Sequence, residues 1–426
     1  MAESQIESSN SVSTTVKKMQ AGTVDLSYKI KPHLPSGFCL PTVINKSIPN
    51  DTLFGNYTYF EVNNANFMSK LDVDISGTAV TATGTSTINS TWHPSQLVDR
   101  VEYRNPQGIL GTVYGESIKF FYDFAPEAVK NNSYNKFLDP ATEAILTNAF
   151  PVSAGQAFKF TLELPSPWTI KGAMTESLKM DLSKYTDFSV YIYFKTKPLS
   201  NIPTQVSFAS VDYVMNLWTY VINQSYVDNL LKMNGAEASS TVYTFDYQRS
   251  SITTALNAVS TTLTSRKQNF IGRTFLRLVP EIPAAGASKA ELPITSLQIQ
   301  FNGTNVFQGT SNTLTARELN GYSKDKFGSS ALTFIYDPTV TDVNAPLTKY
   351  VDNSQFCGVC VHWKMLEDMG IFSGGISTKD LVNVTYVVNH ADAGAVNSYR
   401  LVVIDEVASM LDYDASSLTV SHFTPS

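Results

Sequence analysis

The stretch LVDRVEYRNPQGIL at residues 97–110 decides the fold, because a similar arrangement returns about two hundred residues later. LQIQFNGTNVF at residues 297–307 repeats its order of strand-like run, glycine-containing turn and apolar pair. Short runs rich in Val, Ile, Leu and aromatic residues, bounded by Asn, Pro and Gly, are typical of strands joined by a turn. The repetition predicts two similar β-domains in tandem.

A second pair of landmarks follows in the same order. DFSVYIYF at residues 187–194 is echoed by DLVNVTYVV at residues 380–388. The first pair begins 200 residues apart (97 and 297) and the second 193 (187 and 380), as insertions in loops would produce. Strand-turn-strand units also recur by chance in β-rich chains, so coincidence is the alternative explanation.

The bulk composition suits this arrangement. At 426 residues the chain exceeds one ordinary core, and two domains of about 200 residues match the usual domain size. Hydrophobic residues (43%) and aromatic residues (12%) support packed interiors. Charged residues make up 16%, below the roughly 25% of soluble domains. A surface poor in charge favours protein–protein contact. The alternative explanation of the low charge content is a β-protein with many Thr-rich strands.

Alternating apolar and polar residues, as in YTYFEV at 57–62, predict antiparallel strands with one buried face. Helical patterns are few, and the segment 251–267 is ambiguous between a helix and a long loop. The Pro-bearing stretch 195–203 is the expected linker. We therefore expect an N-terminal arm at 1–20, a first domain at 21–200 and a second at 201–426. Short helices are expected at 126–130, 140–146 and 224–232.

The net charge of −6 argues against nucleic-acid binding, which relies on a basic face. The best basic cluster is expected to be a solvated loop edge. The N-terminal MAESQ lacks the features of a signal peptide, and no apolar run approaches the roughly 18 residues of a membrane span. Three cysteines give no disulfide framework, so synthesis in a reducing cytoplasm is expected. The basic cluster comprises Arg266, Lys267, Arg273 and Arg277.

Chemistry-bearing motifs are weak. CGVC at residues 357–360, with His362 nearby, is one cysteine pair, whereas a structural zinc site needs about four ligands. We interpret it as buried cysteines in a strand. No nucleophile elbow is present, although a Ser-His-Asp triad assembles in space. We predict no catalytic, cofactor-binding or metal-binding residues and no enzyme activity. The acidic pairs, expected to be exposed turn carboxylates, are Asp72/Asp74, Asp405/Glu406 and Asp412/Asp414.

The block at residues 97–106, taken with its echo at 297–305, resembles the double jelly-roll major capsid proteins of tailless, membrane-containing bacteriophages, the tectivirus type. The likeness continues through VSFASVDY at 206–213, interpreted as the strand that opens the second half. It extends to the helix pattern at 226–230 and the terminal strand at 399–404. The stretch 251–290 matches less well.

This resemblance implies an all-β fold of two tandem eight-stranded jelly rolls, with a few short helices in loops and an N-terminal arm. It also implies a homotrimeric, pseudo-hexagonal capsomer of an icosahedral shell around an internal membrane. The implied partners are neighbouring trimers, penton and minor capsid proteins, and the membrane through the arm carrying Lys17 and Lys18. The implied location is the virion, and no sequence-specific contact with nucleic acid is needed.

Two other functions stay open. A tandem β-sandwich that binds glycans, as a lectin, adhesin or phage spike, is favoured by aromatic, Asn-rich loops around Trp92 and residues 131–134. A β-sandwich glycoside hydrolase would need two carboxylates about 5–10 Å apart. The resemblance favours the structural capsid role, and the repeat and the lack of a catalytic motif agree with it.

Overall fold

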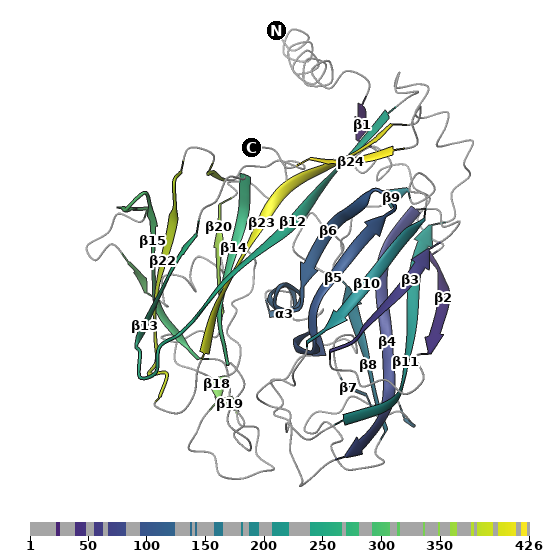
Figure 1. Cartoon of the computed structure of the whole chain (residues 1–426), viewed down its shortest axis with the longest axis horizontal. Coiled ribbons are helices and arrows are strands. Elements are labelled where there is room, and N and C mark those ends of the chain that lie inside the picture. The colour runs from purple at the N-terminus through teal and green to yellow at the C-terminus, as the bar shows by residue number, and fades with distance from the viewer. Residues whose placement is uncertain are drawn as a thin grey trace, which may run out of the picture.

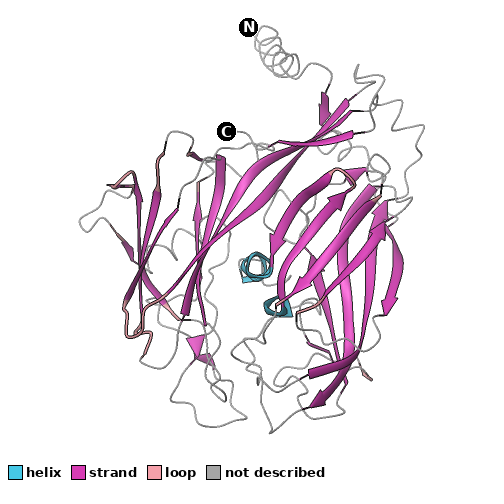
Figure 2. Ribbon diagram, in the orientation of Figure 1, coloured by secondary structure: helices cyan, strands magenta, loops and turns pink. Residues whose placement is uncertain are grey.

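In a computed structural model, the described residues lie mainly in β-strands, which form two sandwiches side by side (Figures 1 and 2). In the described parts, no helix is long and apolar enough to cross a membrane. The structure describes residues 23–25, 39–47, 55–62, 67–81, 94–123, 137–138, 141–142, 157–164, 180–181, 187–195, 207–220, 239–265, 270–280, 292–306, 313–315, 335–336, 348–349, 358–363, 376–378, 381–394, 399–414 and 419–423.

The first sandwich consists of two facing antiparallel sheets, which we call the β4 sheet and the β5 sheet after a central strand. The β4 sheet has the order β2-β11-β4-β8 and the β5 sheet the order β3-β10-β5-β6. Two short strands, β7 and β9, pair with β8 and β4. The bounds are β2 (Cys39–Ser47), β3 (Tyr57–Val62), β4 (Phe67–Thr81), β5 (Val98–Asn105), β6 (Gly108–Tyr114), β7 (Phe137–Leu138), β8 (Ala157–Leu164), β9 (Met180–Asp181), β10 (Phe188–Phe194) and β11 (Ser207–Tyr220).

The second sandwich has the same plan. Its β14 sheet has the order β12-β23-β14-β20, and its β15 sheet has the order β13-β22-β15-β16. The short strands β1, β21 and β24 extend the β14 sheet, β17 extends the β15 sheet, and β18 pairs with β19. The bounds are β1 (Thr23–Asp25), β12 (Ser239–Thr253), β13 (Ser260–Ser265), β14 (Phe270–Pro280), β15 (Ile294–Phe301), β16 (Thr304–Asn305), β17 (Leu314–Thr315), β18 (Ile335–Tyr336), β19 (Thr348–Lys349), β20 (Gly358–His362), β21 (Ile376–Ser377), β22 (Val384–His390), β23 (Tyr399–Asp414) and β24 (Thr419–Phe423).

The two sandwiches share one topology. If the eight main strands of each are numbered along the chain, both give one sheet of order 1-8-3-6 and one of order 2-7-4-5. This is a pair of jelly rolls, so the predicted fold class is confirmed. The landmarks at 97–103 and 297–301 are the fourth strands, β5 and β15. Those at 187–194 and 380–388 include the seventh strands, β10 and β22.

Strand pairing corrects the predicted place of two segments. Strand β11 was expected to open the second half, but it lies between β2 and β4 and is the last strand of the first jelly roll. Conversely, β1 falls within the range expected for the first domain but pairs in parallel with β12 of the second. Both assignments depend on distant partners, which local pattern does not show. The remaining domain boundaries stay predictions.

Alternation of side chains builds each core. In β10, Val190, Ile192 and Phe194 are buried, while Tyr191 and Tyr193 point to the opposite face and are partly exposed. In the second jelly roll, Val384, Tyr386 and Val388 of β22 pack in a core with residues of β14, β15 and β23. Because successive side chains of a strand point to opposite faces, every sheet has a core face and an outer face.

The hairpins that revealed the repeat have related turns. Between β5 and β6, Asn105 Oδ1 accepts the backbone N–H groups of Gln107 (3.1 Å) and Gly108 (3.0 Å). Between β15 and β16, Asn302 and Gly303 have φ values of 49° and 81°, a left-handed pair that suits a two-residue hairpin. Asn therefore stabilises both turns, by a side-chain acceptor in one and by its tolerance of positive φ in the other.

Helical structure differs from expectation. The helix α3 (Gly115–Asp123) and the short 3-10 helix η2 (Pro94–Leu97) were not predicted. The ambiguous segment 251–267 contains the end of β12, a loop and β13, so in its described part it is not a helix. The expected helices at 126–130 and 224–232, and the arm at 1–20, lie outside the described residues. Of the segment 140–146, the structure describes a turn at residues 141–142.

Candidate functional site: the junction between the jelly rolls

The first strand of the second jelly roll, β12, makes the contact with the first. It lies beside β6 in the centre of the molecule (Figure 1). Asp246 Oδ1 of β12 accepts the backbone N–H of Thr112 in β6 at 3.1 Å. A strand edge has unpaired N–H groups that invite non-native pairing. The carboxylate of Asp246 satisfies one of them and helps to fix how the two jelly rolls meet.

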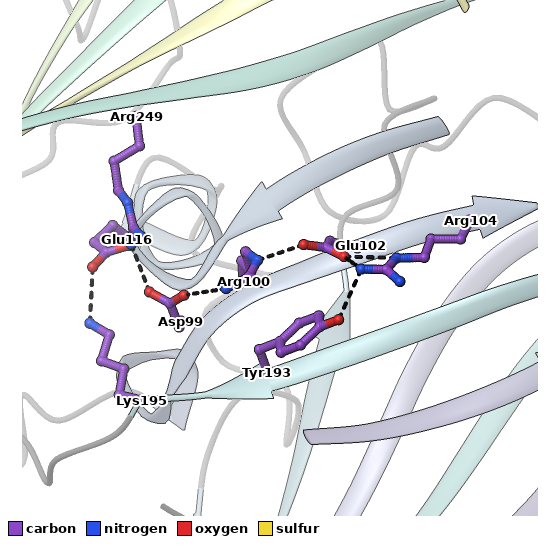
Figure 3. A network of polar contacts seen from close by, with 8 residues as sticks. All are labelled: Asp99, Arg100, Glu102, Arg104, Glu116, Tyr193, Lys195 and Arg249. Atoms are coloured by element: carbon purple, nitrogen blue, oxygen red, sulfur yellow. Dashed lines mark hydrogen bonds and ion pairs between the residues drawn. The ribbon is translucent and has the colours of Figure 1, made fainter. Parts of the chain in front are cut away.

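Three residues further along β12, Arg249 reaches into the first jelly roll (Figure 3). Its Nη1 lies 2.9 Å from Asp99 Oδ1 and 3.5 Å from Glu116 Oε2. Its guanidinium carbon also lies 4.4 Å from the centre of the Tyr114 ring. One cation therefore contacts β5, β6 and the first turn of α3 together. The side chain is 28% exposed, so solvent only partly screens these contacts.

Glu116 connects this arginine to Lys195, the residue that follows β10 in the first jelly roll. Its Oε1 accepts from Lys195 Nζ at 2.9 Å, and its own side chain is only 7% exposed. Lys195 is held by its backbone N–H, which donates to the carbonyl of Leu97 at 2.9 Å. Glu116 also lies in the first turn of α3, where the helix dipole favours a negative charge. The carboxylate is thus stabilised by two cations and a helix end.

The network continues across the outer face of the β5 sheet (Figure 3). Asp99 Oδ2 accepts from Arg100 Nη1 at 3.0 Å, and Arg100 Nε donates to Glu102 Oε1 at 2.6 Å. Arg104 Nε donates to Glu102 Oε2 at 2.8 Å, and its Nη2 donates to Tyr193 Oη at 2.9 Å. Charges of opposite sign therefore alternate from the junction outward along β5.

Electrostatics keep these carboxylates ionised. Burial by itself raises the pKa of Glu116, but the charges of Lys195 and Arg249 outweigh it, so the pKa lies below its ordinary value. The pKa of Asp99 is lowered in the same way by Arg249, and that of Glu102 by Arg100 and Arg104. A general acid needs a raised pKa near the working pH. The junction carboxylates have the opposite property and serve as structural anions.

The outer face of the β14 sheet is buried around the same junction. Arg249 of β12 lies opposite Ile404 of the neighbouring strand β23. Both side chains are on the face opposite the core residues Leu401 and Val403. On that outer face Arg273 and Glu406 form an ion pair, with Nε 2.8 Å from Oε2, and are 2% and 0% exposed. Such a pair tolerates burial because each charge has its partner.

This burial corrects two predictions. Arg273 and Arg277, expected on a solvated loop edge, are buried inside β14. Asp405 and Glu406, expected in an exposed turn, are buried inside β23. Asp405 accepts from Thr274 Oγ1 at 2.8 Å. Positively and negatively charged residues therefore lie on neighbouring strands and can pair there. This pairing is not visible when each stretch of sequence is considered separately.

The other expected sites are placed as follows. Asp72 and Asp74 lie in β4, where Asn216 Nδ2 donates to both, at 2.8 and 3.1 Å. Asp72 is 1% exposed, so it too is no turn carboxylate. Asp412 and Asp414 are strand residues of β23. Cys360 lies in β20, as expected for a strand cysteine, and Cys357 lies outside the described residues. Among the described residues, no group of three or more His, Cys, Asp and Glu side chains could hold a metal ion.

Sequence reasoning did not identify the junction itself. Asp99 and Arg249 are 150 positions apart, and Glu116 and Lys195 are 79 apart. The weak signal available was an alternation of charge along β5, at Arg100, Glu102 and Arg104, on a strand with a buried opposite face.

No family model matches the chain, and no curated protein matches it by sequence. Solved structures do. The capsid of the virus PBCV-1 aligns with a TM-score of 0.58 at 12% identity, over 92% of this chain and 99% of that one. The mavirus major capsid protein aligns with a TM-score of 0.55 at 13% identity, over 92% and 91%. Both neighbours are double jelly rolls, which is the fold that the sequence resemblance implied.

Proposed function

We propose that this chain is a major capsid protein whose homotrimers are the pseudo-hexagonal units of an icosahedral shell. The observation that carries the proposal is the pair of jelly rolls with identical strand order, held together by the junction at Arg249. The similar solved structures are viral capsid proteins, which supports the same role. The chain acts as a building block, and catalysis has no part in the proposal.

The physical argument concerns symmetry. Two similar domains related by a pseudo-rotation, repeated about a three-fold axis, give six comparable corners, and six-cornered units tile a surface. This requires a fixed relation between the two jelly rolls of one chain. The junction supplies it through a hydrogen bond from β6 and ion pairs from β5 and α3. Large contacts within the trimer and weaker contacts between trimers would then allow errors to be corrected during assembly.

The proposed surroundings follow from the same family resemblance. The shell would enclose an internal membrane, against which the N-terminal arm would lie. Penton proteins, minor capsid proteins and neighbouring trimers would be its partners. The acidic net charge of −6 agrees with a coat that does not neutralise nucleic-acid phosphates itself. Synthesis in a host cytoplasm and residence in the virion complete the proposal.

Native mass spectrometry of the purified protein tests the proposal. We expect a species near three times 46.8 kDa that persists at micromolar concentration. Negative-stain microscopy should show particles with a six-cornered outline. A protein that stays monomeric at all concentrations would contradict the proposed capsomer. If trimers form but never assemble into shells with any partner, the trimeric building block would stand and the proposed shell would be contradicted.

A second candidate, glycan binding, is favoured by one surface. The outer face of the β5 sheet carries four tyrosines in contact, with ring centres 5.5 Å apart for Tyr57 and Tyr193 and 5.3 Å apart for Tyr59 and Tyr191. Tyr57 is 52% exposed. Such amphipathic rings are suited to recognition surfaces. A glycan array would test it, with Tyr57→Ala expected to abolish any specific binding. The loops around Trp92 and residues 131–134 lie outside the described residues.

A further inference from the structure

The turn between β15 and β16 consists of two exposed residues, Asn302 and Gly303. Their φ values of 49° and 81° are those of a left-handed pair in a two-residue hairpin. Strand pairing next to the turn joins Phe301 to Thr304, so the backbone N–H of Gly303 takes no part in it. A Cβ atom at Gly303 would meet nothing within 4 Å. The backbone nitrogen next to Asn302 is therefore unhindered and open to water.

Two backbone N–H groups hold the side-chain amide of Asn302. Its Oδ1 accepts from the N–H of Val382 at 2.8 Å and from the N–H of Asn383 at 3.2 Å. The backbone N–H of Asn302 in turn donates to the carbonyl of Asn383 at 3.2 Å. Two N–H donors on one carbonyl oxygen stabilise the negative charge that develops there when a nucleophile attacks the carbonyl carbon. The segment before β22 therefore activates the amide of Asn302.

The equivalent turn of the first jelly roll provides a comparison within the same chain. Between β5 and β6, Asn105 Oδ1 also accepts two backbone N–H groups, from Gln107 at 3.1 Å and from Gly108 at 3.0 Å. The residue after Asn105 is Pro106, whose nitrogen is closed in a ring and has no hydrogen. That nitrogen cannot attack the neighbouring side chain. Of the two turns, only the one in the second jelly roll combines an activated amide with a nitrogen that can react with it.

We propose that Asn302 is a site of spontaneous deamidation. The backbone nitrogen of Gly303 gives up its proton and attacks Cγ of Asn302, while Oδ1 carries the transient negative charge between its two donors. The bond from Cγ to Nδ2 then breaks, so that ammonia leaves with that proton and a succinimide ring remains. Water opens the ring at either of its carbonyl carbons and leaves an aspartyl or an isoaspartyl residue. One water molecule is consumed and one ammonia molecule is released, without an oxidant, a reductant or an enzyme.

The modification changes the contact between this hairpin and the segment before β22. Both products have a carboxylate where the amide of Asn302 was. In the isoaspartyl product the main chain also runs through the former side chain, which adds one methylene group to the backbone. A two-residue hairpin depends on its exact length and turn type, so the hydrogen bonds to Val382 and Asn383 should loosen. This inference goes beyond the proposed capsid role and does not depend on it, because the reaction needs only the fold of one chain.

Peptide mapping by mass spectrometry tests the proposal on the folded, full-length protein after incubation in water enriched in heavy oxygen. We expect Asn302 to lose its amide nitrogen and to gain a heavy oxygen atom, while Asn105 keeps its amide. Asn257 is a second control, because it is exposed and has a φ of 56° but is followed by Ala258, whose side chain hinders attack. An Asn302 that keeps its amide as long as these two controls would overturn the proposal.

Val382→Pro tests the part played by the two donors, because proline lacks the N–H that binds Oδ1 of Asn302. Loss of one such donor is expected to slow the reaction by at least about tenfold. Val382→Ala keeps the N–H and should react at the original rate. If the turn only shielded the amide, the proline variant would react faster, which would overturn the activation by the donors. Thermal unfolding shows whether each variant keeps its fold.

A comparison of folded and unfolded protein tests the same point without a variant. In urea the donors are removed, so Asn302 should react more slowly than in the folded protein. It should then match Asn234 and Asn320, which are also followed by glycine, when the three are compared in the unfolded chain. An Asn302 that reacts faster in urea than in the folded protein would show that the fold protects the amide and would overturn the proposed activation.

Discussion

Arg249 and Asp99 are 150 residues apart in the chain, yet Arg249 Nη1 lies 2.9 Å from Asp99 Oδ1 and joins the second jelly roll to the first. The same guanidinium contacts Glu116 and covers the ring of Tyr114. One side chain thus couples two domains that each have their own core. If the relation between the jelly rolls determines the shape of the proposed capsomer, this arginine would influence assembly through a contact inside the chain.

Replacement of Arg249 by Ala should lower the free energy of unfolding by about 1–2 kcal/mol, because partly exposed ion pairs and cation–π contacts are each worth about 0.5–1 kcal/mol. Chemical denaturation measures the change. A double-mutant cycle with Asp99→Ala should give a coupling energy of about 0.5–1 kcal/mol. Additive effects of the two substitutions would show that the ion pair contributes nothing.

Stability should fall on acidification. The carboxyls of Asp99, Glu102 and Glu116 have a lower pKa folded than unfolded, so the unfolded chain binds more protons between the two values. Their stabilisation is complete above the ordinary pKa values of 3.8 and 4.5 and is lost as pH falls through the folded pKa. Denaturation midpoints across that range should show this. Glu116→Gln should flatten the dependence, and an unchanged slope would contradict the assignment.

The ion pair between Arg273 and Glu406 is expected to be costly to break from one side. Glu406→Leu leaves a buried guanidinium without its carboxylate, a change that typically lowers stability by about 3–5 kcal/mol. The double variant Arg273→Met with Glu406→Leu should recover most of that loss, because it buries no unpaired charge. Urea denaturation compares the two. A double variant less stable than the single one would mean that the two charged side chains stabilise the fold by more than neutralising each other's charge.

Gly115, where α3 begins, should not tolerate a side chain. A Cβ atom there would collide with the backbone carbonyl groups of Ser95 and Val98, which cannot move as a flexible side chain would. Gly115→Ala should lower stability by about 1–3 kcal/mol. Gly394→Ala is a matched control with φ of 75° and open space, and should lose about 1 kcal/mol from backbone strain alone. Equal losses would argue against the steric explanation.

Much of the fold could be predicted because strand formation and turn chemistry are local. The landmarks at residues 97–103 and 187–194 lie on the fourth and seventh strands of the first jelly roll, and their echoes fall on the same strands of the second. A period of two in hydrophobicity is visible in a single stretch of chain. The same holds for the Asn-containing turns after β5 and β15.

The candidate site could not be predicted in this way. Asp99, Glu116, Lys195 and Arg249 belong to four separate segments, and each alone looks like an ordinary surface charge. Asp405, Glu406 and Arg273 were expected in solvent for the same reason, although all three are buried. Whether a charged residue in a strand is buried depends on the side chains of the neighbouring strand and on which part of the chain covers that face of the sheet.

The sequence by itself determined that the chain is a repeat of antiparallel strands, because alternation and turn residues act within a few positions of one another. Only the tertiary structure decided that β11 completes the first jelly roll and that β1 pairs with β12 of the second. It alone decided that Arg249 joins the two jelly rolls. These features depend on pairing between segments more than a hundred residues apart, where the energy of a contact is set by the partner and not by the local pattern.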